Sequence, residues 1–187
     1  MIIFIDGWQG SGKTTLIENC KYKHGRFPFN QYLNKFDLDI NDLQITKDLA
    51  ILFTSQFIKD NVILDRGPFS TIYYSLKEDR YGKDTPLQMM KFMKELREYN
   101  NCQFVWIFKT NDNSLQPRKH NDGFDYLNDD EDPNKEKLLQ SIFDTAQNLG
   151  IMIHTFEVDF SLKEKDNVKR FNDFLEGIIY EYNRNKN

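Results

Sequence analysis

A short glycine-rich segment near the amino terminus limits what this chain can fold into more than any other feature. Residues 7–14 read GWQGSGKT and match the pattern G-x-x-x-x-G-K-[ST], and only Asp6 separates them from the apolar run 2–5. Such a loop binds phosphate when a strand precedes it and a helix follows, because backbone N–H groups and the helix dipole then converge on the anion. We call residues 7–14 the phosphate loop and predict an α/β protein around it.

Short apolar runs alternate along the chain with longer segments of helical period, which is the pattern of a parallel sheet covered on both faces. The predicted strands are residues 2–5, 62–64, 104–108 and 152–158. Residues 26–33 can supply a fifth strand at an edge. We therefore expect a three-layer α/β sandwich, with a mostly parallel five-stranded sheet and helices on both faces.

Apolar residues at helical spacing predict the helices between these strands. The predicted apolar stripes lie in residues 45–53, 89–99, 139–149 and 168–182. Thr85 is the expected N-cap of the second helix, with Pro86 at its first position, and Gly150 can stop the third.

Length and composition fit a single domain, residues 1–187. Apolar residues make up 39% and charged residues 29% of the chain, so it can bury a core. The net charge of −4 offers no broad cationic surface for nucleic acid or membrane. Two cysteines, Cys20 and Cys102, cannot build a disulfide framework or a four-cysteine zinc site. We predict a cytoplasmic protein with reduced thiols, because the opening residues lack a basic leader and are too short a run to span a membrane.

The phosphate loop supplies candidate ligands for the phosphates of a nucleotide and for Mg²⁺. The predicted nucleotide-binding residues are Gly7, Gly10, Ser11, Gly12, Lys13, Thr14 and Thr15. The glycines let the backbone approach phosphate oxygens. Lys13 is expected to bridge the β- and γ-phosphates, and the Thr14 hydroxyl is expected to ligate Mg²⁺.

Asp65 ends an apolar run and would emerge at the carboxyl edge of a parallel sheet, beside the phosphate loop. A carboxylate there can hold Mg²⁺, directly or through water. The predicted metal ligands are therefore Thr14 and Asp65, and capping of the next helix is the alternative for Asp65.

The polar stretch 110–132 has almost no apolar anchors, and a loop of that length in a compact domain is usually functional or disordered. We interpret it as a lid. Arg118 is its candidate catalytic cation, because closure would bring a guanidinium onto a transferring phosphoryl group; a solvated loop is the alternative. Asp132 is the expected cap of the helix that follows.

Three segments resemble parts of the thymidylate kinases. Residues 6–15 (DGWQGSGKTT) resemble that family's opening E-G-x-D-G-[SA]-G-K-[ST]-T. Residues 49–53 and 62–74 resemble its L-L-F segment and its later D-R-x-x-x-S-x-x-A-Y, with the same spacing from Asp65 and Arg66 to Ser70. The resemblance covers roughly a third of the chain and implies a P-loop nucleotide kinase.

That family implies an ATP site at the phosphate loop, a lid, commonly a homodimer, and an acceptor phosphate held by the arginine of its D-R pair, which is Arg66 here. A guanidinium fork fits a phosphate and offsets the repulsion between donor and acceptor. A surface ion pair is the alternative for Arg66. The predicted catalytic residues are thus Lys13, Asp65, Arg66 and Arg118.

At some positions this sequence differs from the family pattern, and these are positions where the family contacts its acceptor. The aspartate of the family's loop is Gln9 here, its arginine after L-L-F falls on Phe57, and its glutamine after A-Y falls on Ser75. Thymine-reading groups are therefore missing. The leading prediction is phosphoryl transfer to a nucleoside monophosphate or a nucleotide-like acceptor.

Two other functions stay open. The missing thymine contacts motivate a kinase for a deoxynucleoside or for a modified base or end of DNA, although the acidic net charge disfavours DNA. A nucleotide-binding regulator without an acceptor is the other alternative. Asp65-Arg66-Gly67 does not form the D-x-x-G of GTPases, and the chain has no N-K-x-D, which lowers this alternative.

Several side chains have both a functional and a structural interpretation. Trp8, Phe69, Tyr73 and Tyr74 are candidates for stacking on an acceptor base, with ordinary core packing as the equal alternative. Cys20 and His24 have the spacing of one helical face, yet two ligands make a poor zinc site. We therefore expect a structural role for that pair.

Overall fold

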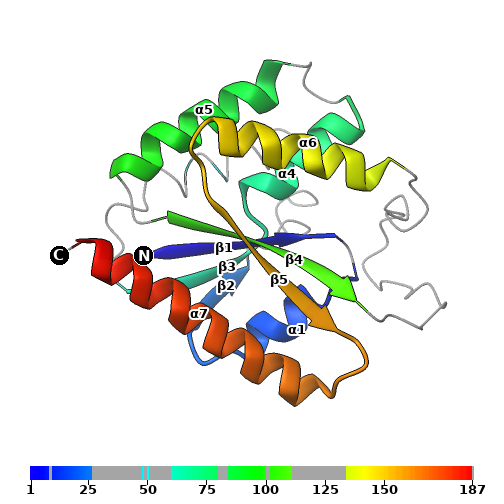
Figure 1. The fold of residues 1–187 in the computed structure, drawn as a ribbon, viewed down its shortest axis with the longest axis vertical. Coiled ribbons are helices and arrows are strands. Elements are labelled where there is room, and N and C mark those ends of the chain that lie inside the picture. Colours follow the sequence, from blue (N-terminus) through cyan, green and yellow to red (C-terminus); the bar gives the residue numbers. More distant parts are fainter. Residues whose placement is uncertain are drawn as a thin grey trace, which may run out of the picture.

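A five-stranded parallel sheet forms the middle layer of the molecule, in the order β2-β3-β1-β4-β5 (Figure 1). The computed structural model describes residues 1–8, 10–26, 48, 50, 60–79, 84–99, 102–110 and 134–186. The strands are β1 (Ile2–Gly7), β2 (Lys23–Arg26), β3 (Val62–Asp65), β4 (Cys102–Thr110) and β5 (Ile153–Asp159). All neighbouring strands in this sheet run parallel, so the expected α/β sandwich is confirmed and its sheet is parallel throughout.

Helices cover both faces of the sheet (Figure 1). The helices α4 (Pro68–Lys77), α5 (Asp84–Tyr99) and α6 (Lys135–Asn148) lie on one face, and α1 (Lys13–Glu18) and α7 (Glu164–Lys186) lie on the other. Each helix turns an apolar stripe to the sheet, as expected for amphipathic helices. Within the described part of the chain, no helix combines the length and the apolar character needed to cross a bilayer.

The central strand β1 shows why the strands of this sheet appear in the sequence as continuous apolar runs. All six of its residues are buried. Because side chains of a strand alternate between faces, Ile2 and Phe4 join the core under α4, α5 and α6, while Ile3 and Ile5 join the core under α1 and α7. A strand covered on both faces has no solvent side on which a polar residue would be favoured.

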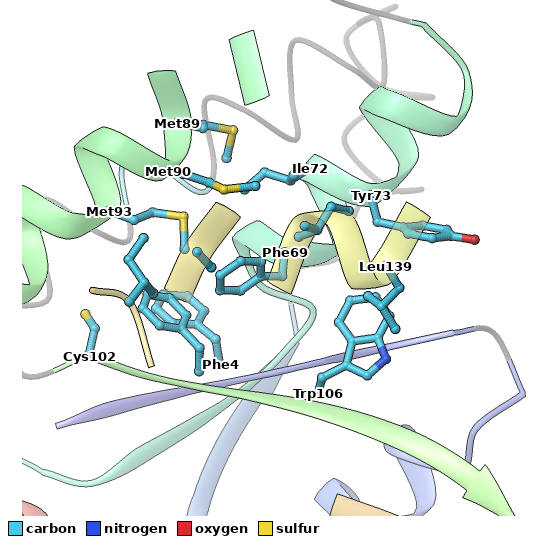
Figure 2. Packing of buried hydrophobic residues seen from close by; sticks show 14 of the residues in the cluster. Phe4, Phe69, Ile72, Tyr73, Met89, Met90, Met93, Cys102, Trp106 and Leu139 are labelled. Atoms are coloured by element: carbon cyan, nitrogen blue, oxygen red, sulfur yellow. The ribbon is translucent and has the colours of Figure 1, made fainter. Parts of the chain in front are cut away.

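The core beneath α4, α5 and α6 is rich in aromatic rings and methionine. Figure 2 shows Met89, Met90 and Met93 of α5 packing above Phe4 and Phe69. The rings of Phe4 and Phe104 stack with their centroids 5.6 Å apart. Unbranched methionine side chains fill the irregular space above these rings.

Several predicted boundaries differ from the structure. The expected edge strand is observed as β2, Lys23–Arg26, which shares only Arg26 with the predicted range 26–33, and residues 27–33 lie outside the described part of the chain. The polar sequence KHGR carries no apolar pattern that could reveal β2. Helix α5 begins at Asp84, one residue before the expected cap Thr85. The N-cap of α6 is Asn134, not Asp132, which lies outside the described residues.

The expected stop of α6 is confirmed. Gly150 follows the C-cap with φ of 74°, a left-handed conformation that favours glycine. Its N–H donates to the carbonyl of Gln147, and the N–H of Ile151 donates to that of Ala146. By contrast, the predicted helix at 45–53 lies outside the described residues except for Asp48 and Ala50, which are helical.

Candidate functional site

The site is built where β1 and β3 end side by side. Their parallel register pairs Ile5 with Asp65, so the phosphate loop after β1 and the turn after β3 begin at the same edge of the sheet. The helices that follow these two strands, α1 and α4, leave on opposite faces (Figure 1). In an open parallel sheet such a divergence creates a crevice at the carboxyl edge, where ligands bind.

The phosphate loop has the backbone shape that its glycines permit. Gly10 and Gly12 adopt φ of 74° and 83°, in the left-handed region that side chains disfavour. Position 7 is restricted by space, because a Cβ there would lie 2.5 Å from the carbonyl oxygen of Ile107. Gly12 is also the N-cap of α1, and its carbonyl accepts a hydrogen bond from the N–H of Leu16 at 3.1 Å.

The Lys13 side chain folds back over the loop that carries it. Its Nζ donates hydrogen bonds to the carbonyl oxygens of Gly7 at 2.7 Å and Trp8 at 2.5 Å, with the hydroxyl of Ser11 at 3.3 Å. The loop thus gathers carbonyl oxygens around one ammonium group. Thr15 completes the predicted nucleotide-binding set in the first turn of α1, where it is half-buried.

The two predicted metal ligands come together. The Thr14 hydroxyl donates to Oδ2 of Asp65 across 3.4 Å, and Asp65 is only 6% exposed. Neighbouring ligands of octahedral Mg²⁺, each about 2.0–2.1 Å from the ion, lie roughly 2.9 Å apart. These two hard oxygens therefore fit a Mg²⁺ site after a small adjustment, or with a water in place of one direct bond.

Arg66 sits directly after Asp65 in a strained backbone conformation. Its φ is 69°, although it is not a glycine, and its N–H donates to the carbonyl of Ile5 at 3.0 Å. A left-handed residue with a Cβ costs about 1–2 kcal/mol. Such strain is found where the surrounding structure holds a functional residue in place.

Asp6 lies in the segment that resembles the thymidylate kinases, but no role was predicted for it from the sequence. The structure buries it to 1% exposure and places its Oδ1 within 2.8 Å of the N–H of Gly67 and 2.9 Å of the N–H of Ser70. The available signal was an acidic residue at the end of a buried strand, immediately before the first glycine of the loop.

Two of the aromatic candidates for base stacking belong to the core. Phe69 and Tyr73 are 1% and 0% exposed, and Figure 2 shows both packed between α4 and the sheet. Stacking on an acceptor base is therefore wrong for these two, and the packing interpretation is right. Tyr74 is half-buried, with its ring edge-on to that of Tyr73, so the structure leaves its stacking role a prediction.

Trp8 is buried in the same core at 7% exposure, so the packing interpretation holds for it too, and it connects the phosphate loop to α6. Its ring meets those of Trp106 and Phe108 edge-on, with centroids 6.3 Å and 5.6 Å away. The Lys135 ammonium lies 4.9 Å from the Trp8 ring centroid, within the range of a cation–π contact. No sequence pattern predicts the contact of Lys135 with Trp8, because it joins residues far apart in the chain.

Some predicted residues lie outside the described part of the chain. They include Gln9 and residues 111–133, and Arg118 belongs to the latter range. Thr110, the first residue of the expected lid, is described and is the last residue of β4. The lid and the role of Arg118 stay predictions.

Cys20 and His24 do not share a helix. Helix α1 ends at Glu18, and His24 lies in β2. Among the described residues, no group of three or more His, Cys, Asp and Glu side chains is placed to hold a metal ion together. Burial raises the pKa of the Cys20 thiol, whose sulfur lies 3.6 Å from the carbonyl of Tyr22.

Solved structures share this fold. A thymidylate kinase from Candida albicans aligns over 94% of this chain and 91% of its own, with a TM-score of 0.52 and 15% identity. A deoxyadenosine kinase from M. mycoides aligns over 95% of this chain and 100% of its own, with a TM-score of 0.52 and 17% identity. The fold is that of the P-loop nucleotide kinases.

Sequence comparison gives no closer relative. No model of a protein family matches the chain, and no curated protein matches its sequence. At 15–17% identity the structural likeness establishes the fold, while the chemistry has to be argued from the residues at the sheet edge.

Proposed function

We propose that this protein is an ATP- and Mg²⁺-dependent kinase that transfers a phosphoryl group to a nucleoside monophosphate or a nucleotide-like acceptor. The observation that carries the proposal is the meeting of Thr14 with Asp65 at 3.4 Å, because it joins the end of the phosphate loop to the end of β3. A phosphate-binding loop, an oxygen pair for a hard cation and an arginine then occupy one edge of the sheet.

On the donor side, the phosphate loop would hold the triphosphate. Lys13 already lies over the loop, held by the carbonyl oxygens of Gly7 and Trp8. Phosphate oxygens are charged acceptors and form stronger hydrogen bonds with an ammonium group than neutral carbonyls do. We therefore expect Lys13 to exchange these carbonyls for the β- and γ-phosphates when ATP binds.

Thr14 and Asp65 would hold Mg²⁺. When bound, the ion supplies charge neutralisation along the phosphates and orients them. The protein's own contribution is to keep the two oxygens adjacent: Thr14 is fixed by the first turn of α1, and Asp65 by its pairing with Ile5.

On the acceptor side, Arg66 would bind the acceptor's phosphate. Its guanidinium can form two parallel hydrogen bonds to one phosphate and offset the charge that opposes the approach of donor and acceptor. Positioning and charge compensation would then account for most of the catalysis, as in phosphoryl transfer generally. Lys13, Asp65, Arg66 and the lid residue Arg118 remain our proposed catalytic set, with the lid at residues 110–132 of a single kinase domain, 1–187.

A deoxynucleoside acceptor is the second candidate. The thymidylate kinase and the deoxyadenosine kinase align with this chain at the same TM-score, so the fold does not choose between a nucleotide and a nucleoside acceptor. Arg66 favours the first, because a guanidinium is best used on an acceptor that already carries a phosphate.

The proposal is tested by an acceptor screen with γ-labelled ATP and Mg²⁺ over nucleoside monophosphates, deoxynucleosides and DNA oligomers. We expect label on at least one monophosphate. Label on deoxynucleosides alone would move the function to the second candidate, and label on DNA with steep salt dependence would identify a DNA kinase. Tight ATP binding without any labelled product would overturn the kinase proposal and indicate a nucleotide-binding regulator.

A further inference from the structure

Asp6 connects the phosphate loop to the turn that carries Arg66. It lies in β1 immediately before Gly7, and its carboxylate Oδ1 accepts hydrogen bonds from the N–H groups of Gly67 and Ser70. Since the residue is 1% exposed, both bonds are shielded from water. We call residues 65–67 the acceptor turn, because they hold the proposed acceptor-binding Arg66.

The backbone of the acceptor turn explains why these two N–H groups need a distant partner. The N–H of Arg66 still donates to the carbonyl of Ile5, as in the β1–β3 ladder, but the positive φ of Arg66 then takes the chain out of the sheet. The next N–H groups belong to the start of α4, where a helix has no acceptors of its own. Pro68 has no N–H, and the N-cap Gly67 has no side chain. Asp6, which lies in β1, therefore caps the N-terminus of α4.

Space restricts the same turn. A Cβ at position 67 would lie 2.6 Å from the Cβ of Phe4 and 2.8 Å from Oδ2 of Asp6. Contacts this short cannot form without displacing backbone or side chain. The acceptor turn is thus held against β1 by contact as well as by hydrogen bonds, and a movement of the Asp6 carboxylate would be passed to Gly67 and to its neighbour Arg66.

We propose that Asp6 is a positioning residue, which fixes the acceptor turn on β1 and thereby sets the placement of Arg66 relative to the phosphate loop. The inference rests on the proposed function, and it deepens that function by assigning a residue outside the phosphate loop to the alignment of donor and acceptor. A carboxylate at a helix N-terminus forms charge-assisted hydrogen bonds, which are about twice as strong as neutral ones.

The same contacts narrow how the acceptor is recognised. The N-terminus of a helix is a common anion site because its N–H groups are free to bind one. In α4 the N–H groups of Gly67 and Ser70 already donate to Asp6. An acceptor phosphate would therefore be bound by the Arg66 side chain rather than by these two backbone groups.

The test compares Asp6→Ala and Asp6→Asn with the exposed control Asp173→Asn on α7. Asp6→Ala removes the acceptor of both hydrogen bonds, so we expect the KM for the acceptor to rise at least about tenfold, while the KM for ATP changes less than about twofold. Asp6→Asn keeps an oxygen that can accept both bonds and should restore most of the loss. Equal increases in both KM values would overturn the proposal, since they would indicate general loosening of the site.

A double-mutant cycle separates positioning from a structural role. If Asp6 acts through Arg66, then Asp6→Asn and Asp6→Ala should add almost nothing to the acceptor KM in an Arg66→Ala background. Additive effects in that background would overturn the proposal. Should Asp6→Ala fail to fold, the cycle is run with Asp6→Ser, whose shorter side chain cannot keep both hydrogen bonds to Gly67 and Ser70.

Amide hydrogen exchange on the ligand-free protein keeps this inference distinguishable from the proposed function. In Asp6→Ala, or in Asp6→Ser if Asp6→Ala does not fold, we expect faster exchange at Arg66 as well as at Gly67 and Ser70, with exchange in β4 unchanged. If Gly67 and Ser70 alone respond, the placement of Arg66 does not depend on Asp6 and the inference is wrong. A wild-type protein that phosphorylates no acceptor would overturn the proposed function, and the exchange pattern would still decide whether Asp6 holds the acceptor turn.

Discussion

The phosphate loop and the acceptor turn meet at one edge of the sheet but are held in different ways. The loop is local: Lys13 bonds to carbonyl oxygens five and six residues earlier, and glycines give the backbone its shape. The acceptor turn depends on Asp6, which precedes Gly67 and Ser70 by 61 and 64 residues. A motif specifies the residues and the spacing of the first region, whereas the second exists only once β1 and β3 have paired.

The largest effect should come from the local region. Lys13→Ala removes the charge that we propose compensates the β- and γ-phosphates, and we expect kcat to fall at least about 100-fold. Because the lost contacts lie within the loop, unfolding by heat should change little. Steady-state kinetics and thermal melts check both, with the exposed Lys169→Ala on α7 as control. Retained transfer by Lys13→Ala would contradict the assigned role of the loop.

The next effect concerns Arg66, where two substitutions should reduce activity equally but differ in their effect on stability. Arg66→Ala and Arg66→Gly both remove the guanidinium, so the acceptor kcat/KM should fall about 100-fold in each, with ATP affinity retained. Arg66→Gly should be more stable than Arg66→Ala by about 0.5–1 kcal/mol, because glycine tolerates a φ of 69°. Chemical denaturation measures this difference. Equal stability of the two variants would show that the turn relaxes in solution, and Arg184→Ala serves as the surface control.

A smaller effect tests the close contact of the acceptor turn with β1. Gly67→Ala places a Cβ 2.6 Å from that of Phe4, and we expect a loss of about 1–3 kcal/mol in the free energy of unfolding. The matched control is Gly177→Ala in α7, where a Cβ meets nothing within 4 Å and should stabilise the helix by about 0.5–1 kcal/mol. Changes of opposite sign in the free energy of unfolding for the two substitutions would support a close contact between the acceptor turn and β1. A neutral Gly67→Ala would argue against that contact.

The smallest effect is the reactivity of a thiol just after α1, on the phosphate-loop side. Burial raises the pKa of Cys20 above its ordinary value of 9.0. The reactive thiolate is therefore rarer at pH 8 in the native protein than in the unfolded chain, and alkylation of Cys20 should be slower when folded and should accelerate as pH rises past 9. Mass spectrometry at several pH values measures this, with the buried Cys102 as an internal reference that should react only on unfolding. Fast alkylation of native Cys20 at pH 7 would show that this region opens.

Elements with a strong apolar or glycine pattern were predictable from sequence. The strand at 62–64 is observed as Val62–Asp65, and the phosphate loop joins a strand to a helix as its pattern requires. The edge strand β2 could not be placed, because an edge strand of four residues reading KHGR is fixed by hydrogen bonds to β3 and not by burial of an apolar face.

Within the candidate site, the residues expected to bind phosphate and metal were predictable from the sequence, but the residues that hold them in place were not. The pairing of Thr14 with Asp65 followed from the rule that parallel strands end at a common edge. The buried Asp6, the enclosed rings of Phe69 and Tyr73, and the contact of Lys135 with Trp8 all depend on which helix covers which face of the sheet. No periodicity in the sequence encodes that choice.

The amino-acid sequence by itself determined that this chain places a glycine-rich loop between a buried strand and a helix, because glycines, a lysine and a hydroxyl at fixed spacing act through the local backbone. Only the tertiary structure decided what stands opposite that loop. Asp65, Arg66 and Asp6 acquire their geometry when two strands far apart in sequence pair in one register, and that pairing is selected by burial of both sheet faces together rather than by any local segment.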